Sequence, residues 1–280
     1  MSSVEECMAT EVNLTSSAPA QGHVPTPLEK AAAPIGGFLS TAADTVVATF
    51  KPPFQWREYV QQCWFVASVA IGPTILLGIP FVALVTFQFN QVLTELGAID
   101  AFSGAGSAFA TVSQIGPVAT TFIIAGAVAT SICADLGARK IREELDAMEV
   151  LGIDPVHRLV VPRVLAAATM AIFLNALLIL IGIGGGFFYS VYLQGASPGV
   201  FIDSMKVLTG NDNLISATIR AAVYGWLGAM IGAYRGLIAK GGAKGVGQAV
   251  NETVVYVFIA LFPVNTVFTQ LQYVLGLVKH

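Results

Sequence analysis

Hydrophobic positions along the chain gather into five long segments that contain hardly any charged residues. They lie at about residues 64–93, 115–136, 164–193, 217–239 and 254–277. A transmembrane helix needs about 20 apolar residues to cross a hydrocarbon core that is ~30 Å thick, and every segment is long enough. The pattern therefore predicts an all-α integral membrane protein with five transmembrane helices.

Two details of the pattern modify this picture. Gly72-Pro73 and Gly78-Ile79-Pro80 fall inside the first segment and should bend or break its helix. Segment 98–114 is rich in small residues and only mildly apolar. We expect a short outer-side or re-entrant helix there rather than a sixth span, because a sixth span would reverse the side of every later loop.

Two further parts of the chain precede the five segments. Residues 1–30 contain much Ser, Thr, Ala, Pro and Glu and no apolar run, which is typical of a flexible tail and unlike a signal peptide. Apolar residues then recur at helical spacing, so we expect residues 31–62 to form an amphipathic helix followed by an anchor. The helix could lie in the membrane interface or pack on protein. Pro52 and Pro53 should end it, and the anchor combines the aromatic and basic residues that favour head-group depth: Lys51, Phe54, Trp56, Arg57 and Tyr59.

Lysine and arginine are distributed unequally between the two sets of loops. Stretch 137–163 has five basic residues and stretch 235–253 has three, whereas 94–114 has none and 194–216 has only Lys206. Basic loops stay on the cytoplasmic side of a membrane. The N-terminus, with its tail, is therefore expected in the cytoplasm, and the C-terminus outside.

The composition excludes several classes of protein. Charged residues make up 11% of the 280 and hydrophobic residues 55%, whereas soluble domains carry about a quarter charged residues. A net charge of -3 without a basic stripe argues against nucleic-acid binding. The three cysteines and three histidines are scattered, no phosphate-binding glycine loop is present, and no catalytic set is recognisable. We expect no cofactor, no metal site, and no enzyme acting alone.

The segment centres contain no Asp, Glu, Lys or His. The nearest charged residues fall close to the predicted span ends, where side chains can reach water or head groups: Asp135, Arg220, Arg235 and Glu252. Transporters driven by ion gradients keep an ionisable residue inside the membrane, so no proton or sodium relay is visible. An uncharged interior suits a lipidic cargo that is moved by an external energy source.

Three glycines of the fourth segment, Gly228, Gly232 and Gly236, are four residues apart. They share one helix face and allow another helix to approach closely. That face could serve packing inside the chain or an interface between subunits.

Stretch 135–162, between the second and third segments, is the most distinctive part of the chain. Glu143, Asp146 and Glu149 line one helical stripe, and Leu145, Met148 and Leu151 line another. Gly152 can cap the helix, and Asp154-Pro155 restarts the chain. Such a helix could dock into a partner or simply connect two spans.

This stretch resembles the signature of the MlaE/YrbE permease family, the membrane subunits of Mla and Mce lipid transporters. The family pattern is a glycine, a basic pair and then E-[EQ]-x-[DS]-A-[ML]-x-x-[ML]-x-[VI]-D-P. The matching residues are Gly137, Glu143, Glu144, Asp146, Ala147, Met148, Leu151, Gly152, Ile153, Asp154 and Pro155. Arg163 after Pro162 and Gly116-Pro117-Val118 also fit, and the resemblance covers about residues 50–278.

The resemblance implies a five-span permease domain at 63–280 in a bacterial inner membrane. Stretch 137–155 would be a coupling helix on a separate ABC ATPase, with the contact assigned to Glu143, Glu144, Asp146, Ala147, Met148, Gly152, Asp154 and Pro155. The other implied partners are a paralogous YrbE-type permease, forming a heterodimer, and MCE-domain proteins on the outer side. The chain looks most like the A-type YrbE subunits of mycobacterial Mce systems, which implies import of fatty acid or sterol.

One departure from the family concerns the lipid pocket. Many members have a charged residue just before the Gly-Pro of the second span, where this chain has Ser113 and Gln114. Aromatic residues Phe81, Phe87 and Phe89 of the first span are candidates for lining a lipid pocket, although such spacing also suits simple packing. A non-transporting scaffold for MCE proteins and a secondary transporter remain as alternative functions.

Overall fold

The computed structural model describes residues 27–51, 55–97, 99–193, 195, 197–208 and 211–274. The tail predicted at 1–26, the residues Pro52, Pro53 and Phe54, and the end of the fifth predicted span after 274 lie outside these ranges. The chain divides into two units, Met1–Leu39 and Ser40–His280, and the second contains all five candidate spans found among the described residues. A helix, α1 (Pro27–Thr49), lies where the amphipathic pattern predicts one; its place in the membrane interface stays a prediction.

Five helical segments are long and apolar enough to cross a membrane, as the hydrophobic pattern predicts. Their bounds are Trp56–Glu95, Gly104–Ile141, Val156–Leu193, Asp212–Leu237 and Gly242–Gln272. The described residues form helices and turns without any strand. The all-α, five-span membrane protein is therefore confirmed.

Three of the five spans are single helices, and the second and third are each built from several helical pieces. The first is α2 (Trp56–Glu95), the fourth is α9 (Asn211–Leu237) and the fifth is α10 (Gly242–Val274). The second joins α3 (Ile99–Phe109), η1 (Ala110–Ile115), α4 (Gly116–Ile123), η2 (Ile124–Val128) and α5 (Ala129–Ile141). The third joins η3 (Val156–Val160), α7 (Val161–Phe188) and η4 (Tyr189–Leu193).

The structure resolves two expectations about these spans. Of the bend or break expected at Pro73 and Pro80, the break does not occur, because α2 is one helix of 40 residues. Each proline removes a single backbone hydrogen bond, and α2 is supported by its packing along α7. Segment 98–114 is not a separate short helix. The backbone at Phe109 stays helical, so α3 continues through η1 into the second span.

The π-helical pieces η1 and η3 have a common cause in the sequence. Each ends shortly before a proline, Pro117 after η1 and Pro162 after η3. A proline has no N–H to donate to the carbonyl four residues earlier, and its ring crowds that carbonyl. The carbonyls concerned belong to Ser113 and Arg158, which lie within η1 and η3. A widened turn relieves this crowding without ending the span.

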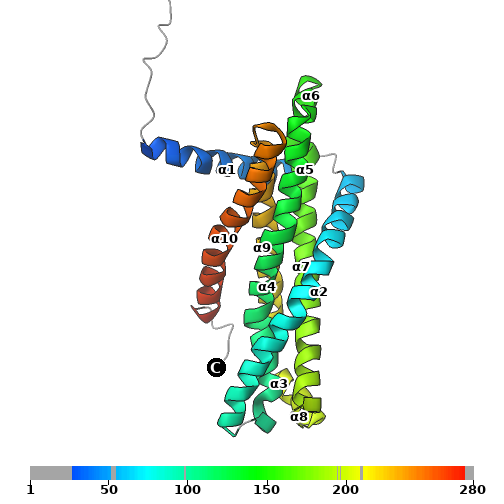
Figure 1. Cartoon of the computed structure of the whole chain (residues 1–280), viewed down its shortest axis with the longest axis vertical. Coiled ribbons are helices and arrows are strands. Elements are labelled where there is room, and N and C mark those ends of the chain that lie inside the picture. Colours follow the sequence, from blue (N-terminus) through cyan, green and yellow to red (C-terminus); the bar gives the residue numbers. More distant parts are fainter. Residues whose placement is uncertain are drawn as a thin grey trace, which may run out of the picture. The chain divides into compact units, whose positions relative to one another are not determined.

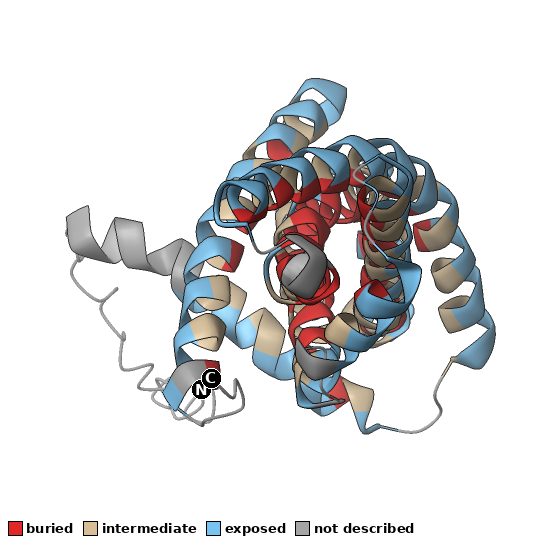
Figure 2. Ribbon diagram, turned by 90° about the horizontal axis from the view of Figure 1, so that it is seen from below, coloured by how far each residue is buried: buried red, intermediate tan, exposed pale blue. Residues whose placement is uncertain are grey.

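The spans pack as a bundle with loops gathered at two ends. α2 lies along α7, α7 and α5 lie along α9, and α10 contacts both α5 and α9. Buried residues occur on the helix faces that turn toward one another (Figure 2). The short helix α6 (Glu144–Val150) lies at one end of the bundle, and α3 packs against α8 (Pro198–Leu208) at the opposite end (Figure 1).

The glycine face of the fourth span packs inside the chain, against the second span. A Cβ at Gly236 would lie 2.9 Å from the carbonyl oxygen of Cys133, and one at Gly232 would lie 3.1 Å from the Cα of Ala129. One at Gly228 would collide with Ile124. The absence of side chains therefore lets α9 approach η2 and α5 at backbone distance.

Candidate functional site

The turn between the second and third spans breaks the helix predicted over 137–155 into two pieces. α5 ends at Ile141, and α6 covers only Glu144–Val150. Glu143 lies between them with φ 59°, a left-handed conformation that non-glycine residues seldom adopt. Its carbonyl accepts the N–H of Ala147 at 3.0 Å, so Glu143 begins α6. The chain thereby changes direction at Glu143 and projects α6 beyond the end of the bundle (Figure 1).

The predicted caps close the other side of α6. Gly152 has φ 73°, its N–H bonds the carbonyl of Glu149 at 3.0 Å, and Ile153 N–H bonds that of Met148 at 2.9 Å. This is the glycine-ended pattern that satisfies the last carbonyls of a helix. Asp154 Oδ1 then accepts the N–H of Val156 at 2.9 Å, and Pro155 leads into η3. Gly152, Asp154 and Pro155 thus shape the turn.

A buried ion pair joins the two spans below this turn. Arg163 Nη2 lies 2.5 Å from Asp135 Oδ2, and the Arg163 side chain is only 1% exposed. Arg163 Nη1 also donates to the carbonyl of Leu159 at 2.8 Å, while Arg139 Nε lies 3.4 Å from the other Asp135 oxygen. Sequence reasoning noted both Asp135 and Arg163 but not their pairing. The available signal was their opposite charge at the facing ends of consecutive spans.

The acidic residues of this turn fall into two groups, those that form an ion pair within the chain and those that do not. Glu144 Oε1 lies 2.9 Å from Arg142 Nε, Glu144 Oε2 lies 3.7 Å from Arg139 Nη1, and Asp146 Oδ1 lies 2.5 Å from Lys140 Nζ. Glu143 and Glu149 are exposed, and neither forms an ion pair within the described part of the chain. Glu144 and Asp146 therefore hold the turn together, whereas Glu143 and Glu149 present free carboxylates.

The apolar side chains of α6 and the residues just after it range from buried to exposed, and the most exposed ones lie at its C-terminal end. Leu145 is buried, Met148 is half-buried, and Ala147 is exposed. At the tip, Val150 is 88% exposed and Leu151 is 74% exposed. Ile153 next to them is also exposed. Exposed apolar side chains gathered in water are typical of a protein contact, and here carboxylates flank them.

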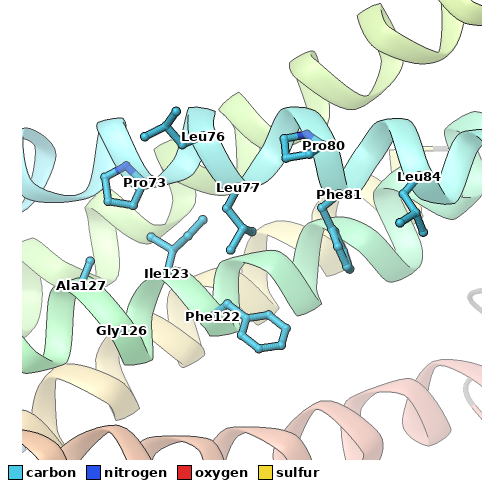
Figure 3. A pocket seen from close by; sticks show the side chains of 10 residues that line it. All are labelled: Pro73, Leu76, Leu77, Pro80, Phe81, Leu84, Phe122, Ile123, Gly126 and Ala127. Carbon is cyan, nitrogen blue, oxygen red and sulfur yellow. The ribbon is translucent and has the colours of Figure 1, made fainter.

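A second feature is an apolar groove of about 750 Å³ on the side of the bundle, between α2 and the second span. The residues that line it are Pro73, Leu76, Leu77, Pro80, Phe81, Leu84, Phe122, Ile123, Gly126 and Ala127. Leu77 and Phe81 point from α2 toward α4, and Ile123 points back toward α2 (Figure 3). Every lining residue is apolar, so the groove suits a hydrocarbon ligand.

The structure separates the three phenylalanines that sequence reasoning grouped. Phe81 lines the groove. Phe87 instead stacks edge-to-face on Tyr189 with ring centroids 5.9 Å apart, and Phe89 packs over Gly106. Phe122, which the pattern did not single out, lines the groove and contacts Phe258 and Phe262 of α10 at 5.4 and 6.3 Å between centroids.

Arg220 lies deeper in the bundle than the sequence suggested. α9 begins at Asn211 rather than near 217, so Arg220 falls more than two turns after the helix start. Its side chain is 1% exposed, and its Nε makes no hydrogen bond. Arg235, by contrast, pairs with Glu252 of α10 and lies over the ring of Tyr256 at 5.1 Å.

Several known proteins have amino-acid sequences that are similar to this chain. A family model described as Permease MlaE matches residues 59–271. A probable ABC transporter permease protein of Synechocystis sp. is 33% identical over 207 residues, covering 74% of this chain and 77% of that protein. A probable ABC transporter permease protein of Rickettsia bellii is 29% identical over 245 residues, covering 85% and 91%.

A chloroplast protein has about the same level of sequence identity to this chain. The protein TRIGALACTOSYLDIACYLGLYCEROL 1 of Arabidopsis thaliana is 30% identical over 234 residues, which are 82% of this chain and 66% of that protein. The family match takes in the turn at α6 and the groove, and nearly all of the five spans. The chain therefore belongs to the MlaE permease family and is a multi-pass permease subunit of an ABC transporter.

Proposed function

We propose that this chain is the permease of an ATP-driven Mce-type transporter that imports a lipid, a fatty acid or sterol, across a bacterial inner membrane. The observation that carries the proposal is the groove beside α2, which is wholly apolar and about 750 Å³ in volume. An acyl chain or a sterol ring system fits such a surface, whereas a polar solute would lose its hydration there without new hydrogen bonds. The Arabidopsis relative carries the name of a glycerolipid, which agrees with a lipid cargo.

The orientation follows from the basic residues at the two ends of the bundle. The end that holds α6 carries Arg139, Lys140, Arg142 and Arg158. Lys240 in the turn after α9 and Lys244 in the first turn of α10 add to them. The end that holds α3 and α8 carries Lys206. Basic residues favour the cytoplasmic side, which supports the proposal that α6 and the N-terminus lie in the cytoplasm and the C-terminus outside.

The energy source in this proposal is a separate ATPase that docks on the turn around α6. Val150, Leu151 and Ile153 would fill an apolar cavity of the ATPase, and Glu143 and Glu149 would meet its donors. The ion pairs of Glu144 and Asp146 support force transmission, because they fix α6 to the end of α5. The pair of Arg163 and Asp135 extends this connection to the third span.

The remaining partners rest on the resemblance to A-type YrbE subunits. A paralogous permease would cover exposed apolar faces of the spans, and MCE-domain proteins would meet the end that holds α3 and α8. Large apolar side chains exposed along α10, such as Ile259 and Val267, face either lipid or such a second permease.

Co-purification followed by reconstitution tests the proposal. The tagged chain, extracted in mild detergent, should bring with it an ATPase, a second permease chain, MCE-domain proteins and a lipid. The reconstituted complex should transfer that lipid between vesicles only when ATP is hydrolysed. Recovery of MCE-domain proteins without an ATPase, or a complex that hydrolyses ATP without lipid transfer, would instead support the scaffold function.

A further inference from the structure

Two prolines lie inside the helix of the first span. Pro73 and Pro80 both belong to α2, and neither has an N–H to donate to the carbonyl four residues earlier. The carbonyls of Val69 and Leu76 therefore lose their helical partner, and inside a membrane no water can replace it. Sharp bends in helices occur mostly at prolines. The part of α2 from Pro73 to Pro80, which we call the hinge segment, is thus where this helix resists bending least.

The hinge segment and the turn after it form one wall of the apolar groove. The residues of α2 that line the groove are Pro73, Leu76, Leu77, Pro80, Phe81 and Leu84. The opposite wall is the second span, which contributes Phe122, Ile123, Gly126 and Ala127 (Figure 3). Since the wall on α2 coincides with the part of the helix that bends most easily, a change in the bend changes the width of the groove.

Side-chain hydrogen bonds hold α2 to the third span on both sides of the hinge segment. Tyr59 Oη donates to Thr169 Oγ1 at 3.0 Å near the start of α2. Near its end, Asn90 Nδ2 donates to Ser190 Oγ at 3.2 Å, and both of these residues are buried. In lipid such bonds have no water to compete with them. The two ends of α2 are therefore fixed to the third span.

Between these two bonds, α2 packs on α7 without hydrogen bonds between side chains. Among the described residues, no side chain from 64 to 89 forms a hydrogen bond with another span. Within the hinge segment only Thr74 and Gly78 are buried, and a Cβ at Gly78 would lie 2.8 Å from Leu178 Cδ2 of α7. Apolar contacts are not directional. The hinge segment can therefore shift against α7 without breaking a hydrogen bond between the helices.

We propose that Pro73 and Pro80 are positioning residues of the lipid path, because they let the middle of α2 bend while its two ends stay on the third span. The bend sets the width of the groove, which admits a lipid when the hinge segment moves outward and releases it when the segment moves back. Conformational steps of this kind limit the turnover of many proteins. The inference rests on the proposed lipid-transport function and deepens it by naming the element that moves.

Lipid transfer and stability of proline variants of the complete transporter test the proposal. Pro73→Ala and Pro80→Ala each restore the missing N–H and stiffen the helix. The variant with both changes should keep or raise the free energy of unfolding. Its ATP-driven lipid transfer should nevertheless fall about tenfold or more, because bending now breaks backbone hydrogen bonds. Pro263→Ala is the matched control and should transfer lipid at the wild-type rate, since Pro263 also lies inside a helix, α10, but does not line the groove.

Glycine at the same two positions separates flexibility from shape. The double variant Pro73→Gly, Pro80→Gly also restores both N–H groups, but it leaves the backbone free to bend. It should therefore keep about half of the wild-type transfer or more, although it should be less stable than the double alanine variant. A purely structural role of the prolines does not predict this opposite order of stability and transfer.

A distance measurement detects the movement itself and decides the question if the alanine variants do not fold. Spin labels are attached at Ile79→Cys in the hinge segment and Phe173→Cys on α7, in a chain whose native cysteines are replaced by alanine. Both positions are exposed, and neither lines the groove. Their separation should change when ATP binds to the transporter. In the control, Val92→Cys replaces Ile79→Cys, because Val92 is exposed and two residues from the fixed Asn90; its distance to Phe173→Cys should stay constant.

The contrary results are equally definite. Wild-type transfer by the double alanine variant, or equal loss of transfer in the alanine and glycine variants, would overturn the inference. An unchanged distance at Ile79→Cys in a transporter that transfers lipid would also overturn it, and would leave the proposed function intact. A wild-type transporter that moves no lipid would overturn the proposed function instead.

Discussion

Arg163 and Asp135 form a 2.5 Å ion pair at the ends of two consecutive spans, with the arginine side chain fully buried and the carboxylate one-third exposed. The pair fixes the separation at which the chain leaves α5 and returns into α7. All of the turn that holds α6 lies between these two residues. The pair therefore sets the base from which α6 projects, and it links any force on α6 to two spans.

Removing the carboxylate of this pair should destabilise the protein. Asp135→Ala leaves the buried guanidinium of Arg163 without its partner, and we expect a loss of about 2–3 kcal/mol in the free energy of unfolding, below the value for a fully buried pair because Asp135 is partly exposed. Arg163→Met removes the charge itself and should cost less. Denaturant titration in detergent measures both, with Arg158→Met as the control, because Arg158 is exposed and forms no ion pair within the described part of the chain. Equal stability of Asp135→Ala and Arg158→Met would show that the pair contributes nothing.

The left-handed backbone of Glu143 makes a prediction about substitutions at that position. Glu143→Gly adopts φ 59° without the strain that any side chain with a Cβ causes there, and it should retain or raise stability. Glu143→Val should lower stability, because a β-branched side chain fits this region worse than glutamate does. Glu143→Asn tolerates the conformation and removes the carboxylate, so it isolates the role of the charge in coupling. Thermal unfolding of the three variants checks the order. If Val were as stable as Gly, the turn would not have this conformation in solution.

The exposed tip of α6 should determine ATPase binding. Leu151→Glu places a charge where an apolar contact is proposed, and we expect at least about tenfold weaker ATPase binding with unchanged stability. Val200→Glu is the matched control, because Val200 is also an exposed apolar residue but belongs to α8 at the other end of the bundle. Surface plasmon resonance with immobilised complex measures the affinity. Equal loss in both variants would point to general damage rather than to a docking surface.

Gly126 offers a way to close the groove without disturbing the fold. A Cβ at Gly126 meets no atom within 4 Å, and the residue lines the groove. Gly126→Leu should therefore fold normally, fill part of the cavity, and reduce lipid transfer several-fold. Gly184→Leu is the control, since Gly184 is exposed with open space around it but does not line the groove. Normal transfer by Gly126→Leu would argue against the groove as a lipid path.

The glycines that face the second span should behave in the opposite way. A Cβ at Gly232 would press on the backbone of Ala129, and backbone cannot yield as a flexible side chain can. Gly232→Ala should lower the free energy of unfolding by about 1–3 kcal/mol through overpacking, even though alanine favours helix. Gly247→Ala, at a helical position with open space, should be neutral or stabilising. The same denaturant titration compares them.

The sequence was most informative where one physical rule dominates. All five spans follow from apolar length, since only a helix satisfies its own backbone in lipid. Gly152 and Asp154 were identified as the end of α6 because capping is a local property. The break at Glu143 could not be foreseen, since a glutamate carries no signal for a left-handed backbone. The continuity of α3 with the second span depends on the π-helical piece η1, which accommodates Pro117.

Features that depend on how several helices pack together could not be predicted from the sequence. Hydropathy placed the start of the fourth span near 217, so Arg220 looked like an end residue; the polar first turns of α9 are helical nevertheless. Phe81, Phe87 and Phe89 look equivalent by composition, but only the arrangement of α2 against α4 and α7 decides which one lines the groove. The pairing of Asp135 with Arg163 likewise depends on the register of two spans.

ATP-driven lipid transfer by the double variant Glu143→Ala, Asp146→Ala tests the central claim most directly. The complex is reconstituted in vesicles, and transfer is compared with that of wild type and of Asp203→Ala, an exposed carboxylate on α8. Wild type and Asp203→Ala should transfer lipid only with ATP. The double variant should assemble with MCE-domain proteins yet transfer no more lipid than wild type does without ATP. Transfer at the wild-type rate in the double variant would contradict a permease that is driven through α6.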